Sequence, residues 1–294
     1  MRLATVQIDG RPTLVGQTQD VLIDLSKAAP ALPDTLLGLL SAPDAMLAAA
    51  RAMAAGSRTA AVDPTSVTWL PTIPRPGKII CVGLNYRDHS AESGFQQPAY
   101  PTLFARFASS LVGHEAPIIR PLASEQLDYE GEVAAVVGRG GRHISHAQAL
   151  DHVAGYTLFN DASIRDYQTK APQWTVGKNF DGTGAFGPYF VSADELPPGL
   201  RGLELTTRLN GQVVQRASTD DLVFSVADLV ATISEAITLE PGDVIVTGTP
   251  SGVGLARKPP LWMRAGDRVE VEVEGLGRLS NPVADEVGAT AATA

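Results

Sequence analysis

Residues 127–132 read Leu-Asp-Tyr-Glu-Gly-Glu and run directly into the apolar stretch Val-Ala-Ala-Val-Val at 133–137. On an extended strand, alternate residues point to the same face, so the pattern places Asp128, Glu130 and Glu132 together. Like charges at that spacing repel one another unless a cation or solvent relieves them. A site built from carboxylate oxygens suits Mg²⁺, Mn²⁺ or Ca²⁺. The alternative is a solvated acidic edge at the start of a buried strand.

A third carboxylate is needed to complete such a site, and Asp161 is the candidate. It follows the apolar stretch Gly-Tyr-Thr-Leu-Phe at 155–159 and Asn160. This position indicates the end of a strand. The alternative is a helix cap in front of residues 162–167, and the sequence alone leaves both open.

Length and composition describe a globular protein. The chain has 294 residues, of which 44% are hydrophobic and 19% are charged, and this composition is unlike that of a disordered protein. The net charge of −9 argues against nucleic acid as a partner. The single cysteine, Cys81, cannot form an internal disulfide, which fits a reducing compartment. Asp9 interrupts any signal peptide, and no apolar run is long enough to span a membrane, so we expect a cytoplasmic protein.

Three closely spaced prolines, Pro71, Pro74 and Pro76, divide the chain. They cannot continue a helix or a central strand, so they indicate an extended linker. We therefore predict a small α+β domain over 1–72, a catalytic domain over 73–285 and a frayed tail over 286–294.

The second of these segments is rich in strands. Strands are expected over 79–82, 132–137, 205–209, 212–214, 244–246 and 269–273, with Asn210-Gly211 as a two-residue hairpin turn. Helices are expected over 145–153 and 226–237 in this segment, and over 33–55 in the N-terminal one. Because a regular βαβ rhythm is missing, the predicted class is α+β and strand-rich.

A possible general base lies in Gly-Leu-Asn-Tyr-Arg-Asp-His-Ser-Ala-Glu at 83–92. His89 and Glu92 are three residues apart, so on a helical turn they share a face, and Glu92 would orient the imidazole. This pairing suits the activation of water. The alternative is an exposed polar turn.

Two further features point to anion or carbonyl binding. Lys178 lies between apolar neighbours, although an isolated lysine is more often exposed to solvent. The Gly- and Thr-rich loop 247–254 follows the strand expected at 244–246 and offers backbone N–H groups and hydroxyls. The letters G-x-G-x-x-G at 182–187 fail as a dinucleotide motif, since Pro188 follows them and no helix opens there.

Taken in order, five segments resemble the fumarylacetoacetate hydrolase family, in particular its bacterial acylpyruvate hydrolases and 2-hydroxyhepta-2,4-diene-1,7-dioate isomerases. They are 83–92, 127–132, 155–163, 177–188 and 247–254. The similarity covers roughly residues 70 to 285. It implies a mixed β-roll catalytic domain behind a small α+β N-terminal domain, assembled as a homodimer.

The resemblance also implies roles for individual residues. Glu130, Glu132 and Asp161 match the family's ligands for Mg²⁺ or Mn²⁺, with Ca²⁺ as a substitute in crystals. His89 and Glu92 match its catalytic pair.

A second group of positions matches residues that contact the substrate. Lys178 would stabilise negative charge during the reaction. Tyr86, Gly248 and Thr249 would bind substrate, as would Arg106, which stands where relatives often carry a lysine.

The family's substrates are 2-oxo and 2,4-dioxo acids. The resemblance thus implies a metal-dependent hydrolase that cleaves a C–C bond of an acylpyruvate-like acid, giving pyruvate and a carboxylic acid. The alternatives are an isomerase or tautomerase, a decarboxylase acting on a related 2-oxo acid, and a degenerate binding protein without activity.

Overall fold

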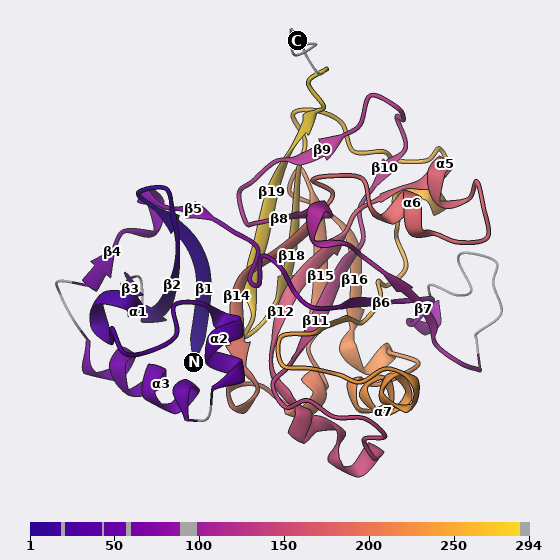
Figure 1. The fold of residues 1–294 in the computed structure, drawn as a ribbon. Helices are drawn as coiled ribbons and strands as arrows, with labels where there is room; N and C mark the ends of the chain where they lie inside the picture. The colour runs from indigo at the N-terminus through magenta and orange to yellow at the C-terminus, as the bar shows by residue number, and fades with distance from the viewer. Residues whose placement is uncertain (19–20, 43, 57–59, 89–98, 289–294) are drawn as a thin grey trace, which may run out of the picture.

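The computed structural model describes residues 1–18, 21–42, 44–56, 60–88 and 99–288. The chain forms an α+β structure dominated by strands, which confirms the predicted class (Figure 1). Its strands lie in two large sheets and a small two-stranded one. No helix in the described ranges combines the length and apolar character required to cross a bilayer.

The N-terminal segment contributes one end of the largest sheet, together with three short helices. Strands β1 (Arg2–Ile8) and β2 (Arg11–Thr18) form a hairpin, and β3 (Val21–Asp24) and β4 (Ala61–Val62) extend it. Helices α1 (Leu25–Ala28), α2 (Leu36–Ser41) and α3 (Ala45–Ala55) follow β3. The prediction of one helix over 33–55 is wrong. Ala42 precedes a proline and is extended, with φ −105° and ψ 126°, because a residue before proline is disfavoured in the helical region.

The largest sheet carries these N-terminal strands into the rest of the chain. Its order is β4-β3-β2-β1-β14-β12-β11-β17-β6-β7. The strands beyond β1 are β14 (Gly184–Ser192), β12 (Val153–Asp161), β11 (Gly131–Val137), β17 (Val244–Val246), β6 (Ile79–Gly83) and β7 (Thr102–Ala105). Short strands β5 (Thr68–Trp69) and β8 (Leu111–Val112) pair with β1 and β14. The division into domains at residue 72 stays a prediction.

A second sheet packs against one face of the first. Its order is β16-β15-β18-β19-β9, with bounds Gln212–Ser218, Glu204–Leu209, Arg268–Val273, Gly277–Asp285 and Ile118–Arg120. Asn210 and Gly211 have φ of 52° and 78°, the left-handed values that a two-residue hairpin turn requires. The predicted hairpin is therefore confirmed.

Strand β11 is buried on both faces, as its continuous apolar run predicts. Val133 and Ala135 pack toward Val271 of the second sheet, whereas Ala134 and Val136 pack toward the core below the N-terminal helices. Glu130 and Glu132 share the face of Ala134, and Gly131 shares the face of Val133.

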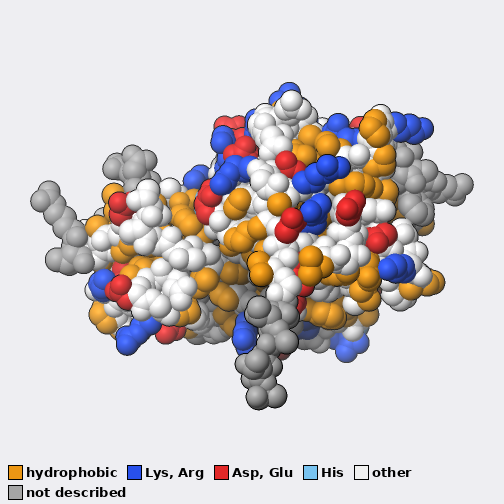
Figure 2. Space-filling model, turned by 90° about the horizontal axis from the view of Figure 1, so that it is seen from above, with side chains coloured by type: hydrophobic (Ala, Val, Ile, Leu, Met, Phe, Trp, Pro, Cys, Tyr) orange, Lys and Arg blue, Asp and Glu red, His pale blue; other side chains and the backbone are white. Residues whose placement is uncertain are grey.

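The helices beyond residue 145 are short. Helix α7 (Val226–Ala236) matches its prediction and begins with a capping box between Ser225 and Asp228. Residues 146–152 form a 3₁₀ helix, and the hydroxyl of Ser145 does not cap it. Helices α5 (Arg165–Gln168) and α6 (Thr175–Lys178) lie near the paired strands β10 (Leu127–Asp128) and β13 (Ser163–Ile164). On the face seen from above, basic and acidic side chains are interspersed (Figure 2).

Gly131 lies where the two sheets approach closely. A Cβ atom at this position would lie 2.0 Å from Oγ1 of Thr207 and 3.2 Å from Cγ2 of Val271. Real Cβ atoms do not tolerate such a contact with Oγ1. The glycine between the two glutamates is therefore required by packing, independently of any chemistry.

We expect Gly131→Ala to lower the free energy of unfolding by about 1–3 kcal/mol, the usual cost of overpacking. Adding Thr207→Ala removes the oxygen that the new methyl group would meet. The double variant should recover most of the loss, with a coupling energy of about 0.5–3 kcal/mol in a double-mutant cycle measured by urea unfolding. Additive losses would show that the two positions do not interact.

Candidate functional site

Three buried carboxylates meet on the face of the large sheet that looks away from the second sheet. Strands β11 and β12 pair antiparallel with Gly131 opposite Asn160, and this register brings Asp161 beside Glu130. The Asp161 amide donates to the Glu130 carbonyl at 2.8 Å. One oxygen from each of Glu130, Glu132 and Asp161 lies within 4.8 Å of the others. Asp161 thus ends a strand, and the helix-cap alternative is wrong, since α5 begins after Ile164.

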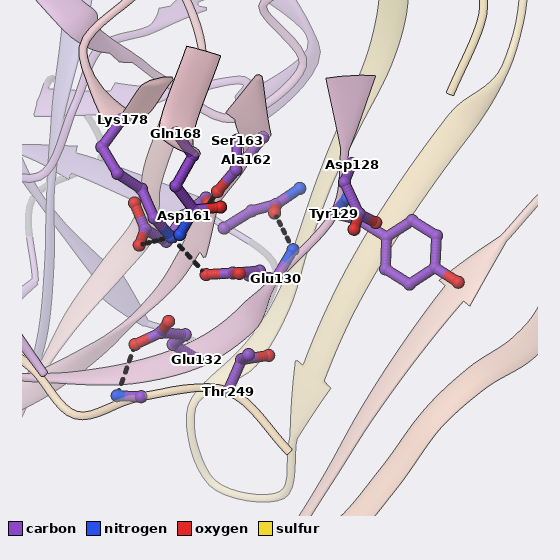
Figure 3. A network of polar contacts seen from close by, with 12 residues as sticks. Asp128, Tyr129, Glu130, Glu132, Asp161, Ala162, Ser163, Gln168, Lys178 and Thr249 are labelled. Atoms are coloured by element: carbon purple, nitrogen blue, oxygen red, sulfur yellow. Dashed lines mark hydrogen bonds and ion pairs between the residues drawn. The ribbon is translucent and has the colours of Figure 1, made fainter. Parts of the chain in front are cut away.

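Lys178 bridges two of these carboxylates (Figure 3). Its Nζ lies 2.6 Å from Oε2 of Glu130 and 2.7 Å from Oδ2 of Asp161. The side chain is buried, so the exposed-lysine alternative is wrong. Burial lowers the pKa of Lys178, but the nearby Asp161 and Glu130 carboxylates outweigh it, and the net pKa lies above its ordinary value. The lysine is therefore held protonated.

Two arginines form further ion pairs with the same carboxylates. Arg106 contacts Asp161 through Nη1 and donates from Nη2 to Oγ1 of Thr183 at 2.7 Å. It is buried, and it is not among the described residues that line the cavity below. Arg165 places Nη1 2.7 Å from Oε1 of Glu130. The same Nη1 donates to Oε1 of Gln168 at 2.8 Å.

Arg165 and Gln168 were not predicted as site residues from the sequence. Both side chains are buried, and both line the cavity. Their closeness to Asp161 in the sequence could have indicated them. They follow it by four and seven residues, and α5 turns the chain back toward it.

Glu132, the third carboxylate, is held differently from Glu130 and Asp161. Its Oε2 accepts from the Gly248 amide at 2.5 Å. Within the described part of the chain, no lysine or arginine forms an ion pair with it. Burial raises the pKa of Glu132 well above its ordinary value, and the carboxylates of Asp161 and Glu130 raise it further. A divalent cation bound by oxygen ligands would relieve this repulsion, so the donor set fits Mg²⁺ or Mn²⁺.

The Gly248 amide reaches Glu132 because residue 248 is a glycine. Its φ is +102°, and a Cβ there would lie 2.9 Å from the Val82 carbonyl oxygen. The amide that was expected to meet substrate thus holds a carboxylate of the site. The hydroxyl of Thr249 is also engaged, donating to the Gly131 carbonyl at 2.9 Å.

Asp128 does not join the cluster, contrary to the expectation from alternation. Strand β10 ends at Asp128 and β11 begins at Gly131, so the extended register is broken between them. Asp128 instead accepts from the amides of Gly254 at 2.7 Å and Leu255 at 2.9 Å, and from Nε of Arg165 at 2.8 Å. In Figure 3 it lies apart from the three carboxylates.

A cavity of about 320 Å³ opens onto Glu130 and Glu132, and Asp161 lies behind them, outside the described lining. Its polar side consists of Glu130, Glu132, Arg165, Gln168, Lys178 and Thr249. Its apolar side includes Leu84, Phe104, Trp174, Val253 and Leu255. The arrangement provides a charged floor for an anionic group and an apolar wall beside it.

The remaining predicted residues lie in or near segment 83–92. Tyr86 is buried, and burial raises the pKa of its hydroxyl. It is not among the described residues that line the cavity, although Gly83 and Leu84 are. His89 and Glu92 lie outside the described residues, whose range resumes at 99.

Comparison with known proteins assigns a family to this architecture. Residues 78–284 match the family model described as fumarylacetoacetate (FAA) hydrolase C-terminal. A Rattus norvegicus protein named as a mitochondrial oxaloacetate tautomerase is 40% identical over 263 residues, covering 89% of this chain and 83% of that protein.

Solved structures share the whole architecture. Fumarylacetoacetate hydrolase from Exiguobacterium antarcticum superposes with a TM-score of 0.83 at 34% identity, covering 97% of this chain and 100% of that one. Maleylpyruvate hydrolase from Sphingobium sp. SYK-6, solved with manganese(II) and pyruvate, gives a TM-score of 0.80 at 27% identity, with 98% and 100% covered. The matched range contains all three carboxylates and Lys178, and the chain is an enzyme of the fumarylacetoacetate hydrolase family.

Proposed function

We propose that this enzyme is a divalent-cation-dependent tautomerase of a 2-oxo acid of the oxaloacetate type. The observation that carries the proposal is the buried carboxylate cluster, which faces a cavity together with the protonated Lys178. The rat protein named as an oxaloacetate tautomerase supports this reaction over hydrolysis, the reaction favoured by the sequence, because it is 40% identical, whereas the maleylpyruvate hydrolase is 27% identical.

Glu130, Glu132 and Asp161 would hold the cation. When bound, the cation supplies positive charge that attracts the substrate carboxylate and polarises the adjacent 2-oxo group. The carboxylates otherwise repel an anionic substrate, so the cation and the three neighbouring basic side chains together make the cavity receptive to one.

Enolisation of a 2-oxo acid removes a proton from C3 and builds negative charge on the oxygen at C2. Lys178 is held protonated at the cavity floor, where Nζ donates hydrogen bonds to oxygen atoms. A fixed cationic donor of this kind stabilises a developing oxyanion. Arg165 and Gln168 line the same side and would orient the substrate carboxylate.

The proton itself needs a base, and we assign that role to His89, oriented by Glu92. The assignment rests on the sequence pattern and on the described residues Gly83 and Leu84, which precede His89 in the chain and line the cavity. A tautomerase returns the proton to the substrate, so no water needs to be placed for attack.

Hydrolysis of an acylpyruvate is the second candidate. The maleylpyruvate hydrolase structure, which holds manganese(II) and pyruvate, favours it. In that reaction the same base would activate water to attack the distal carbonyl, and the pyruvate enolate would leave. The two reactions share their charge stabilisation and differ in whether water is positioned.

An assay on oxaloacetate distinguishes these candidates. We expect the enzyme with Mg²⁺ to accelerate loss of the enol absorbance of oxaloacetate, and EDTA to abolish the effect. Acetylpyruvate and fumarylpyruvate should release no pyruvate in a coupled assay. Metal-dependent pyruvate release without enol turnover would overturn tautomerisation and establish hydrolysis.

Glu132→Gln should weaken Mn²⁺ binding by roughly 100-fold or more, because it removes a charged ligand and even indirect changes near metal ligands cost 10–100-fold. Isothermal titration calorimetry measures the affinity. Glu274→Gln, in an exposed turn, is the matched control and should bind as wild type. Equal affinity in both variants would refute the ligand assignment.

His89→Ala should slow tautomerisation by about 10²–10⁴-fold, the usual contribution of a general base, while Mn²⁺ affinity stays unchanged. His146→Ala, at an exposed ion pair with Asp228, serves as the control. A wild-type rate in His89→Ala would place the base elsewhere in the cavity.

A further inference from the structure

The peptide units around Gly131, between the two glutamates, are held by hydrogen bonds with three side chains, of which only Thr249 lines the cavity. The Gly131 amide donates to Oε1 of Gln215 at 3.0 Å, and the Gly131 carbonyl accepts from Oγ1 of Thr249 at 2.9 Å. The preceding amide, of Glu130, donates to Oδ1 of Asn160 at 2.9 Å. The backbone that carries Glu130 and Glu132 is thus fixed at successive polar atoms.

Gln215 uses both the oxygen and the nitrogen of its side-chain amide in these contacts. Its Nε2 donates to Oγ1 of Thr249 and to the Pro250 carbonyl, both at 2.9 Å. The orientation of the amide is unambiguous, because the Gly131 N–H can only donate and the Pro250 carbonyl can only accept. One side chain therefore ties strand β11 to the loop that follows β17.

The same loop touches the proposed ligands directly. Its Gly248 amide donates to Glu132 at 2.5 Å, and Thr249 lines the cavity. A shift of the loop along β11 would move the Gly248 donor away from Glu132. Gln215 fixes that register while remaining outside the site. It is 2% exposed, lies on β16 of the second sheet and is not among the described residues that line the cavity.

We propose that Gln215 is a positioning residue that sets the geometry of the carboxylate site from the opposite side of the sheet. Gly131 makes this reach possible, because its missing side chain lets the second sheet approach. The inference rests on the proposed role of Glu130 and Glu132 as cation ligands. It assigns Gln215 no contact with substrate.

The test compares Gln215→Met with Gln212→Met. Methionine preserves the length of the side chain but neither accepts from Gly131 nor donates to Thr249 and Pro250. Gln212 begins the same strand and is exposed, so the same substitution there is the matched control. The readouts are Mn²⁺ affinity by electron paramagnetic resonance, thermal unfolding without metal, and kcat and KM for the 2-oxo acid.

We expect Gln215→Met to weaken Mn²⁺ binding about 10–100-fold, the range for residues that orient metal ligands. The lower affinity should come with a lower kcat, and Gln212→Met should match wild type in both.

Wild-type Mn²⁺ affinity and kcat in a folded Gln215→Met would overturn the proposal. So would a lower unfolding temperature without metal accompanied by unchanged affinity, since that pattern describes a purely structural role. If wild type binds Mn²⁺ but turns over no 2-oxo acid, the proposed reaction fails, and the affinity series still decides on Gln215. If wild type binds no Mn²⁺, both proposals fail.

Discussion

Three carboxylates share one buried site, and this concentration of negative charge is the constraint on which the surrounding structure depends. Burying an ion is costly unless opposite charges and hydrogen bonds compensate for the lost water. Lys178, Arg106 and Arg165 supply that compensation from three separate segments of the chain. The short helices α5 and α6 each place one of these cations beside the carboxylates: Arg165 lies on α5 and Lys178 on α6.

The compensation is uneven: among the described residues, the three cations form ion pairs with Glu130 and Asp161 and none with Glu132. A fully neutralised cluster would be an internal salt-bridge network with no affinity for a further cation. Here the Gly248 amide donates a hydrogen bond to Glu132, whose pKa is raised by burial and by the neighbouring carboxylates. A carboxylate in this environment is stabilised by a nearby cation, which is the physical basis of the proposed divalent-ion site.

Much of this structure could be predicted from local sequence. The Asn210-Gly211 turn and the apolar run at 133–137 depend on neighbouring residues, and both were predicted. The strand end at Asp161 was one of two alternatives that the sequence left open. The predicted helix over 33–55 missed the break at Ala42, and alternation misplaced Asp128 because the strand is interrupted after it. Gln215 was missed because its contacts with Gly131 and Thr249 join residues far apart in the chain.

The pairing of β1 with β14 gives the N-terminal segment a role that its composition does not suggest. Leu3 lies opposite Phe190, and the core below the N-terminal helices is continuous with Phe159, two residues before Asp161. The proline-rich stretch near residue 72 marks a change in composition. One sheet and one hydrophobic core nevertheless include residues from both sides of it. A chain shortened to residues 73–285 would lose the pairing of β1 with β14 and expose the β14 backbone around Phe190. An exposed edge strand is a template for aggregation. The N-terminal segment thus covers the edge of the sheet that carries the carboxylate cluster.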